Sequence, residues 1–349
     1  MRRDEHLLRL LEEPHTPLDD LAAPADWKEW YHFVLIDPAG GTRILANTSL
    51  SGVPGRGQII NTVIANVAPR PGDTRADTYG FSSDLEWEKG MVEPAPLRVR
   101  NREIRCEISG SDSLFESCDR YAQIDLAFRG KARASPMMIP EFTPFGSGFI
   151  GWSLVPGLEV VGRLHLGARE IVIDETWFCY HDHNYGRFRW GEDVGWIWFV
   201  AALRSATGAR FTLVLHRGNN RDQTHCGAPY LFIYQDDELR KMFLGEAVHL
   251  RWRWSRRRQR PARLPGSMAT LFGDRTLLLP VGLELRAADE RDSLTLDLIG
   301  DSNTELILAD NRDRQYSFIE ECTGGATMDC HLGGRRHSTQ GYFYAEFVH

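Results

Sequence analysis

The sequence predicts an all-β protein of two domains with one short helix at its N-terminus. After residue 26, short apolar or alternating runs are separated by Gly, Pro, Asn and Asp, which is the pattern of antiparallel strands joined by turns. The chain has 349 residues, which is too long for one ordinary core and suits two domains of about 150 residues each. Many short strands at this spacing indicate barrels or sandwiches.

The bulk composition excludes several classes of function. Hydrophobic residues make up 42% and charged residues 26% of the chain, as in soluble globular proteins. The formal net charge of −7 argues against a nucleic-acid partner. The six cysteines form no CxxC pair and no zinc-like spacing, and no run approaches the roughly 18 apolar residues of a membrane span. With no visible signal peptide, we expect a cytoplasmic protein with reduced thiols.

The N-terminal residues predict a short helix followed by a linker. Four leucines are placed on one helical face: Leu7, Leu8, Leu10 and Leu11. Pro14 ends this pattern, and residues 14–26 hold three prolines. We expect the helix to dock on the protein body rather than on a membrane, because its polar face carries as many acids as bases. Residues 1–25 therefore form a helix and linker of their own.

The first domain, residues 26–194, is expected to consist of antiparallel strands. Its strand candidates are residues 27–36, 43–50, 58–67, 97–108, 121–128, 158–166 and 170–180. Residues 129–150 are rich in Pro, Met and Phe and are expected to form a loop that lines or covers an apolar pocket, with a packed Ω-loop as the alternative. Residues 114–124 have helical periodicity instead.

The second domain, residues 195–349, continues in the same way. Its strand candidates are residues 195–203, 210–217, 229–235, 247–255, 276–287, 293–300, 305–309, 315–322 and 341–348. Residues 236–245 are the exception, because their periodicity is helical.

A weak internal repeat suggests that the two domains share one architecture. Residues 166–183 resemble residues 332–348: in each, a Leu-Gly turn and an Arg lead into an aromatic strand that carries Tyr-x-acid. The Tyr-x-acid segment is Tyr180-His181-Asp182 in the first copy and Tyr344-Ala345-Glu346 in the second. A gap of two residues is needed to align the copies.

The strongest candidate site is the segment 177–199. Its polar residues are Tyr180, His181, Asp182, His183, Asn184, Tyr185 and Arg187. Its aromatic residues are Trp177, Phe178, Trp190, Trp196, Trp198 and Phe199. Titratable side chains among bulky apolar ones are typical of a pocket that handles protons for an apolar ligand. The alternative is a strand end with a polar turn, in which the aromatic residues serve only as core.

Strand alternation divides the polar residues of this segment into two faces. Tyr180 and Asp182 share one face, and His181 and His183 share the other. In an aromatic cavity, burial would raise the pKa of Asp182, so that it can hold a proton and give it to an alkene or carbonyl, with Tyr180 orienting it or stabilising a cation. The alternative is that Asp182 caps the turn at residues 184–186. The His pair has no third ligand at a diagnostic spacing, so we predict hydrogen bonding and no metal.

Residues 251–263 form the one strongly basic run. Trp252 and Trp254 alternate with Arg251 and Arg253, which predicts a strand with one buried face followed by a solvated hairpin loop. A contact of this run with an acidic carrier protein or with a membrane surface is left open. No P-loop, GxGxxG, GxSxG or HExxH motif is present, so no cofactor is predicted. No feature of the sequence sets the oligomeric state.

Three blocks of the sequence resemble a known family. Residues 27–33, WKEWYHF, resemble an EWWYF-type opening, while residues 180–186 and 195–199 are similar to aromatic-x-Asp-His-x-Trp-Gly and GWxWF blocks. These blocks occur in the lipocalin-like proteins grouped with carotenoid 1,2-hydratase (hydroxyneurosporene synthase), which include tocopherol-cyclase-like and kievitone-hydratase-like enzymes and the lipocalin-like Diels–Alderases. The resemblance implies two lipocalin-like β-barrel domains, a ligand cavity between or within them, and chemistry without a cofactor on hydrophobic unsaturated substrates.

The resemblance also implies which residues act. Tyr180 and Asp182 match the catalytic Tyr-x-Asp pair. The upstream His-x-Trp falls near residues 150–152, where Trp152 is present and the His is absent, and this departure argues against carotenoid hydration itself. The expected substrate-binding residues are Trp152, Trp177, His181, His183, Tyr185, Trp196 and Trp198.

We therefore expect a lyase or an isomerase that hydrates or cyclises an isoprenoid or polyketide alkene by acid catalysis. A pericyclase and a carrier of lipophilic ligands remain as alternatives.

Overall fold

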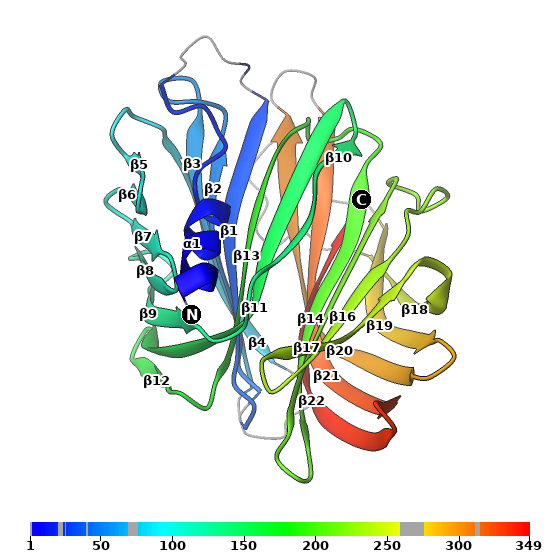
Figure 1. Cartoon of the computed structure of the whole chain (residues 1–349). Helices are drawn as coiled ribbons and strands as arrows, with labels where there is room; N and C mark the ends of the chain where they lie inside the picture. Colours follow the sequence, from blue (N-terminus) through cyan, green and yellow to red (C-terminus); the bar gives the residue numbers. More distant parts are fainter. Residues whose placement is uncertain are drawn as a thin grey trace.

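The structure is a computed structural model that describes residues 2–19, 24, 26–39, 41–68, 76–258, 276–310 and 315–349. It contains one helix, α1 (Arg2–Leu11), and two antiparallel sheets that curl into half-barrels and lie side by side (Figure 1). The predicted fold class, all-β with two lipocalin-like barrels and a short N-terminal helix, is confirmed. Over the described ranges, no helix is long and apolar enough to cross a membrane.

The first sheet has thirteen strands among the described residues. They are β1 (Trp27–Ile36), β2 (Arg43–Ser51), β3 (Gln58–Val67), β4 (Asp77–Glu86), β5 (Val92–Pro94), β6 (Leu97–Arg100), β7 (Ile104–Ser109), β8 (Asp112–Asp119), β9 (Ile124–Ala132), β10 (Met137–Phe145), β11 (Gly148–Leu166), β12 (Arg169–Ile173) and β13 (Phe178–Arg187). The strand order is β4-β3-β2-β1-β13-β11-β9-β8-β7-β6-β5, with β10 and β12 also paired to β11.

The second sheet has nine strands in the part of the chain that the structure describes. They are β14 (Gly195–Ser205), β15 (Arg210–Asn219), β16 (Tyr230–Gln235), β17 (Glu238–Leu244), β18 (Val248–Arg258), β19 (Thr276–Ala288), β20 (Ser293–Asp310), β21 (Gln315–Leu332) and β22 (Arg335–Val348), with a 3-10 turn η1 (Gly245–Ala247) after β17. The strand order is β17-β16-β15-β14-β22-β21-β20-β19-β18.

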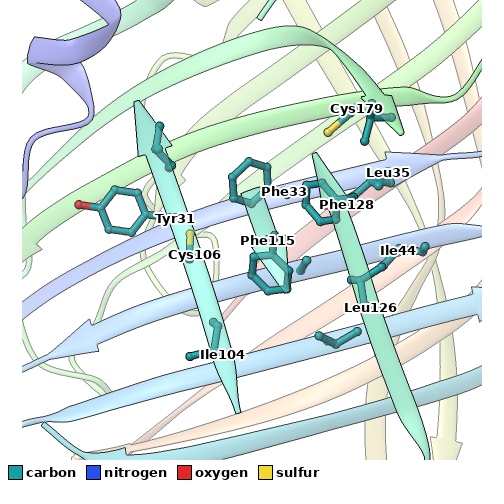
Figure 2. Close-up of a cluster of buried hydrophobic side chains, with 14 of the residues drawn as sticks. Tyr31, Phe33, Leu35, Ile44, Ile104, Cys106, Phe115, Leu126, Phe128 and Cys179 are labelled. Atoms are coloured by element: carbon teal, nitrogen blue, oxygen red, sulfur yellow. The ribbon is translucent and has the colours of Figure 1, made fainter. Parts of the chain in front are cut away.

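Alternation along the strands divides the buried side chains into three cores. One core fills the curl of the first sheet, where Phe33 of β1 meets Phe115 of β8 and Phe128 of β9 (Figure 2). A second fills the curl of the second sheet. The third lies between the two sheets and contains Tyr180 together with side chains from both halves. Neighbouring residues on a strand point to opposite faces, so each central strand serves its own core and the shared one.

The internal repeat predicted from the sequence is present in the structure. Leu166 pairs with Arg169 across a Gly-containing turn, and Leu332 pairs with Arg335 across another. In the first half, β11 then pairs with β12 and β13, with a turn at residues 174–177 between them. In the second half, β21 pairs with the uninterrupted β22. The two halves therefore place β13 and β22 at corresponding positions.

Several local predictions are wrong. The segments 114–124 and 236–245, predicted to be helical, contribute to β8 and β17. The predicted loop 129–150 contains β10 and the beginning of β11. The single strand predicted at 170–180 is divided into β12 and β13. Edge strands such as β17 bury few side chains, so the alternation that identifies a strand is weak there.

The N-terminal helix docks on the body, as predicted, but not through all four leucines. Leu8 is buried in the core of the first sheet, whereas Leu7 and Leu10 are 42% and 48% exposed. Helix α1 lies against the first sheet in Figure 1. Glu12, the residue after the helix, is also buried, and its partner is a buried histidine described below.

The basic run begins as a strand with the predicted alternation. Arg251 and Arg253 are exposed, and Trp252 and Trp254 pack against Phe347 of the second sheet. The side chains of residues 256–263 lie outside the described residues.

Candidate active site between the two sheets

Aromatic side chains from three strands meet where the two sheets face each other. Trp30 of β1 stacks on Trp196 of β14, with ring centroids 6.1 Å apart and planes at 15°. Tyr180 of β13 packs on Trp198 of β14 with ring centroids 5.3 Å apart. The even-numbered residues of β1, β13, β14 and β22 face this interface, because alternate residues of a strand share a face.

Asp182 lies in this interface and accepts three hydrogen bonds. The Tyr180 hydroxyl donates to Oδ2 at 2.8 Å, the Trp152 Nε1 donates to the same oxygen at 3.1 Å, and the Asn184 amide donates to Oδ1 at 2.7 Å. The Trp198 Nε1 donates in turn to the Tyr180 hydroxyl at 3.3 Å. Strand alternation therefore places Tyr180 beside Asp182, as predicted, and the prediction of Asp182 as a cap for the turn at 184–186 does not describe these contacts.

The environment of Asp182 favours its neutral form more than water does. Burial raises the pKa of Asp182 to about 6, although the hydrogen bonds from Tyr180 and Trp152 lower it. About a tenth of the molecules then carry the proton on Asp182 at pH 7.

Glu346 is a second buried carboxyl in the same interface. The Trp196 Nε1 donates to Oε2 at 2.9 Å, and Glu346 occupies on β22 the position of Asp182 on β13. Burial raises the pKa of Glu346 to about 8, the Trp196 hydrogen bond lowers it, and the Asp182 charge raises it. The sequence contained the signal for this residue, since Tyr344-x-Glu346 is the second copy of the repeat, but it was not predicted as a site residue.

His32 lies between the two carboxyls. It pairs directly with Asp182 in the register of β1 and β13, and its Nδ1 is 3.5 Å from the Glu346 Oε1. Burial lowers the pKa of His32 to about 3, with a further contribution from His181, so the ring is neutral at physiological pH. His32 was also missed from the sequence, because strand register between distant segments cannot be read from spacing.

Two neighbouring cavities open among these residues. The larger has a volume of about 350 Å³ and lies between strands of both sheets, with Trp30, Trp190 and Trp196 among its walls. The smaller has a volume of about 20 Å³ and is bounded by Asp182, Trp152, Trp198 and His216, among others. Four residues line both cavities: Trp30, His32, Trp196 and Glu346.

The structure brings four of the predicted binding and catalytic residues to Asp182 and separates the others from it. Trp152, Trp196, Trp198 and Tyr180 surround the small cavity or its acid. The remaining predicted residues, Trp177, His181, His183 and Tyr185, do not line either cavity. Trp177 belongs to the core of the first sheet, and Tyr185 stacks on His15 with ring centroids 3.4 Å apart.

The two histidines hold the N-terminal segment instead. His181 Nε2 lies 3.1 Å from the Glu12 Oε2, and His183 Nε2 lies 2.8 Å from the Glu29 Oε1. His183 Nδ1 is 2.6 Å from the carbonyl oxygen of Leu11. Burial lowers the pKa of His183, but the Glu29 carboxylate outweighs it and raises the pKa overall. The predicted hydrogen-bonding role of the His pair therefore describes their contacts.

One further residue of the small cavity was not predicted. His216 of β15 packs on Trp152 with ring centroids 5.0 Å apart. The resemblance implied a His two residues before Trp152, which this sequence lacks, and in the structure His216 of the second sheet lies beside Trp152. Over the described ranges, no group of three or more His, Cys, Asp and Glu side chains has the arrangement of a metal site.

Solved structures with the same fold span nearly the whole chain. A protein assigned as AttH from Nitrosomonas europaea is similar with a TM-score of 0.60 and 13% identity, over 96% of this chain and 98% of that one. Kievitone hydratase from Nectria haematococca is similar with a TM-score of 0.55 and 11% identity, over 92% and 88%. CghA with Sch210972 is similar with a TM-score of 0.59 and 12% identity, over 93% and 88%.

Because the sequence identities are only 11–13%, these similarities show the fold alone. No protein-family model matches the sequence, and no curated protein sequence matches it.

Proposed function

We propose that this protein is an enzyme that hydrates or cyclises an alkene of a hydrophobic isoprenoid or polyketide without a cofactor, with Asp182 as its proton donor. The observation that carries the proposal is the arrangement of the two cavities. The larger is lined by apolar side chains such as Trp30 and Trp196 and by polar ones that include Glu321, and it has room for a ligand of mainly apolar character. The smaller places Asp182 beside a space that is large enough for one water molecule.

The geometry supports a short sequence of proton transfers. Protonated Asp182 gives its proton to one alkene carbon, and the positive charge develops on the other carbon. A water molecule in the small cavity adds to that carbon and returns a proton to the Asp182 carboxylate, so the acid is regenerated. In a cyclisation, a second alkene of the substrate adds in place of water, and loss of a proton to Asp182 completes the reaction. The ring faces of Trp30 and Trp196 stabilise the cation.

Tyr180 is the positioning residue for this acid. Its hydroxyl donates to Asp182 and accepts from Trp198, so both the carboxyl and the phenol are fixed before a ligand enters. The proposal is also supported by the fold, since kievitone hydratase has the same architecture.

The proposal is tested by changing Asp182 to Asn. Kievitone and a panel of isoprenoid and polyketide alkenes would be incubated with the protein in heavy water, and products would be examined by mass spectrometry and NMR. We expect Asp182→Asn to lower turnover by about a hundredfold or more, because the transferable proton is lost. Tyr180→Phe should cost less, because the ring remains. Deuterium should appear on one product carbon.

A pericyclase is the second candidate function. It is favoured by one observation: Asp182 does not line the larger cavity, so a ligand folded there could react without proton transfer. A pericyclic reaction would place no deuterium on carbon and would survive Asp182→Asn, because shape alone holds the substrate in its reactive conformation. That pair of results would exclude Asp182 as the proton donor.

A further inference from the structure

The larger cavity has three Trp rings and two carboxyl groups in its walls. Trp30, Trp190 and Trp196 line it together with Glu321 and Glu346. Trp196 joins the two sets of side chains. Its ring stacks on Trp30 and has its centroid 6.2 Å from that of Trp190, and its Nε1 donates to the Glu346 Oε2 at 2.9 Å. Aromatic rings beside carboxylates are the surroundings in which proteins bind substituted ammonium groups.

The two carboxyl groups are neighbours on adjacent strands. Glu321 of β21 pairs directly with Glu346 of β22, so their Cβ atoms are about 5 Å apart. Glu321 is 2% exposed and Glu346 is 9% exposed. In the part of the chain that the structure describes, no Lys or Arg side chain forms an ion pair with either of them. Two buried carboxylates repel each other, so the pair is stable only with a proton or a cation between its members.

One oxygen of this pair is open to a ligand. The fold seals off the Oε2 of Glu321, and Trp196 occupies the Oε2 of Glu346. The Oε1 of Glu346 is not sealed in this way and accepts no hydrogen bond from the described residues; its ion-pair neighbour is the Nδ1 of His32, 3.5 Å away. Because Glu346 lines both cavities, this oxygen can take a partner from either of them.

The charged groups around the cavity leave this place to a ligand. The Nζ of Lys28 lies 3.5 Å from the carbonyl oxygen of Trp27, at the outer end of β1. Burial keeps the ring of His32 neutral at physiological pH, because it lowers the pKa to about 3. The charge of Asp182 raises the pKa of Glu346, so this neighbour adds negative potential. The surroundings of Glu346 therefore favour a positive group over a neutral or negative one.

We infer that the larger cavity binds an organic cation, a substituted ammonium group on an otherwise apolar molecule, between the carboxyl groups of Glu321 and Glu346 and the Trp rings. The ammonium group takes the place of the proton that the two carboxyl groups share. The inference rests on the proposed function in one respect: it makes an amine-bearing alkene the substrate. Both agree on charge, because surroundings that hold an ammonium group also favour a carbocation.

The test compares three molecules of similar shape and different charge. They are benzyltrimethylammonium, its neutral isostere neopentylbenzene, and the anion phenylmethanesulfonate. Binding to the full-length protein would be followed by tryptophan fluorescence, since three Trp residues line the cavity. A pH near 9 is used because the pKa of Glu346 is about 8. We expect the cation to bind about tenfold more tightly than the neutral isostere, and the anion to show no saturable binding.

Matched variants locate the charge. Glu346→Gln keeps an acceptor for Trp196 and should remove the preference for the cation. Neopentylbenzene should bind to it as before, which shows that the cavity is intact. Glu321→Gln should reduce the preference by about three- to tenfold, and either variant decides the test if the other does not fold. Glu320→Gln is the control, because Glu320 is a buried acid on the same strand that lines neither cavity; the preference should not change.

Three results would overturn the inference. They are equal affinity of the wild-type protein for the cation and its neutral isostere, a preference that is unchanged in Glu321→Gln and Glu346→Gln, and saturable binding of the anion. Asp182→Asn should keep the preference, because Asp182 does not line the larger cavity. Loss of turnover in Asp182→Asn, with no preference for the cation, would support the proposed function and refute this inference. Full turnover in Asp182→Asn, with the preference present, would do the reverse.

Discussion

The strand pairs β1–β13 and β14–β22 occupy corresponding places in the two halves and carry different chemistry toward the shared interface. Asp182 accepts hydrogen bonds from Tyr180, Trp152 and Asn184, whereas Trp196 is the hydrogen-bond donor to Glu346. Both carboxyls are buried, yet the pKa is about 6 for Asp182 and about 8 for Glu346. Hydrogen-bond donors therefore offset part of the free-energy cost of burying a carboxylate.

The same strand pairs differ as much on their inner faces. β13 points Cys179, His181 and His183 into the first sheet, and β22 points Phe343, Ala345 and Phe347 into the second. The second core is closed by apolar side chains. The polar face of β13 is matched by Glu12 and Glu29, so the first core is completed only by the N-terminal segment.

The largest expected effect comes from replacing a residue on the inner face of the first sheet with the residue at the corresponding position of the second sheet. His183→Phe copies the residue found at the corresponding position, Phe347, and leaves Glu29 buried without its ionic partner. We expect a loss of about 3–5 kcal/mol in the free energy of unfolding, measured by chemical denaturation at neutral pH. Adding Glu29→Gln should recover part of it, because no charge is then left unpaired. A loss below about 1 kcal/mol would show that the Tyr31 hydroxyl and the backbone N–H donors satisfy Glu29 without His183.

The second expected effect is a difference in how stability depends on pH. Each carboxyl has a higher pKa in the folded chain than in the unfolded one, so folding takes up protons at both. The stability that each contributes to the folded chain is present at low pH and is lost as the pH rises. This contribution falls between pH 3.8 and about 6 for Asp182, and between pH 4.5 and about 8 for Glu346. Between pH 6 and 8, Glu346 should therefore contribute a fall of about 1.4 kcal/mol per pH unit, and Asp182 almost none.

Two variants measure this difference. Glu346→Gln should flatten the decline in unfolding free energy between pH 6 and 8, leaving the part due to Glu321, whose pKa is also raised. Asp182→Asn should run parallel to the wild-type protein over the same range. Parallel curves for both variants would mean that Glu346 is ionised throughout, and the contrast between the two halves would then be lost.

The smallest expected effect is on the indole donors. Trp152→Phe removes one of three hydrogen bonds to Asp182, and Trp196→Phe removes the donor to Glu346. Each change should raise the pKa of its carboxyl, because the donor favours the ionised form. We expect a shift of about one unit or less for Asp182 and a larger one for Glu346, from ¹³C NMR titration of the carboxyl carbons. Equal shifts would indicate that the two remaining donors do not compensate at Asp182.

The sequence predicted central strands well, because their apolar side chains are buried on both faces. The run at residues 27–36 matches β1, and the run at 58–67 matches β3. The predictions failed at exposed edges and also at β8, an inner strand of the first sheet that was predicted to be helical. In β17, Phe243 is the one buried residue, and β10 carries Pro140 and Pro144, which an edge strand tolerates because its outer N–H groups need no partner.

The site was predictable within one strand and not between strands. Alternation placed Tyr180 and Asp182 on one face of β13, and the repeat pointed to Glu346 at the corresponding place. The meeting of His32 with Glu346 depends on how the two sheets pack, which no spacing in the sequence encodes. The His pair was predicted as part of the binding site, but it lines neither cavity, because His181 contacts Glu12, which follows helix α1 far away in the sequence.

The contacts of the N-terminal segment join parts of the chain that are synthesised at different times. Glu12 and His181 are separated by 169 positions, and Leu11 and His183 by 172. At ordinary rates of translation, β13 leaves the ribosome roughly 10–30 s after α1. A helix of ten residues is marginally stable by itself. Helix α1 therefore emerges before the strand that holds it, and until β13 follows, the nascent chain leaves Glu12 and the carbonyl group of Leu11 without their histidine partners.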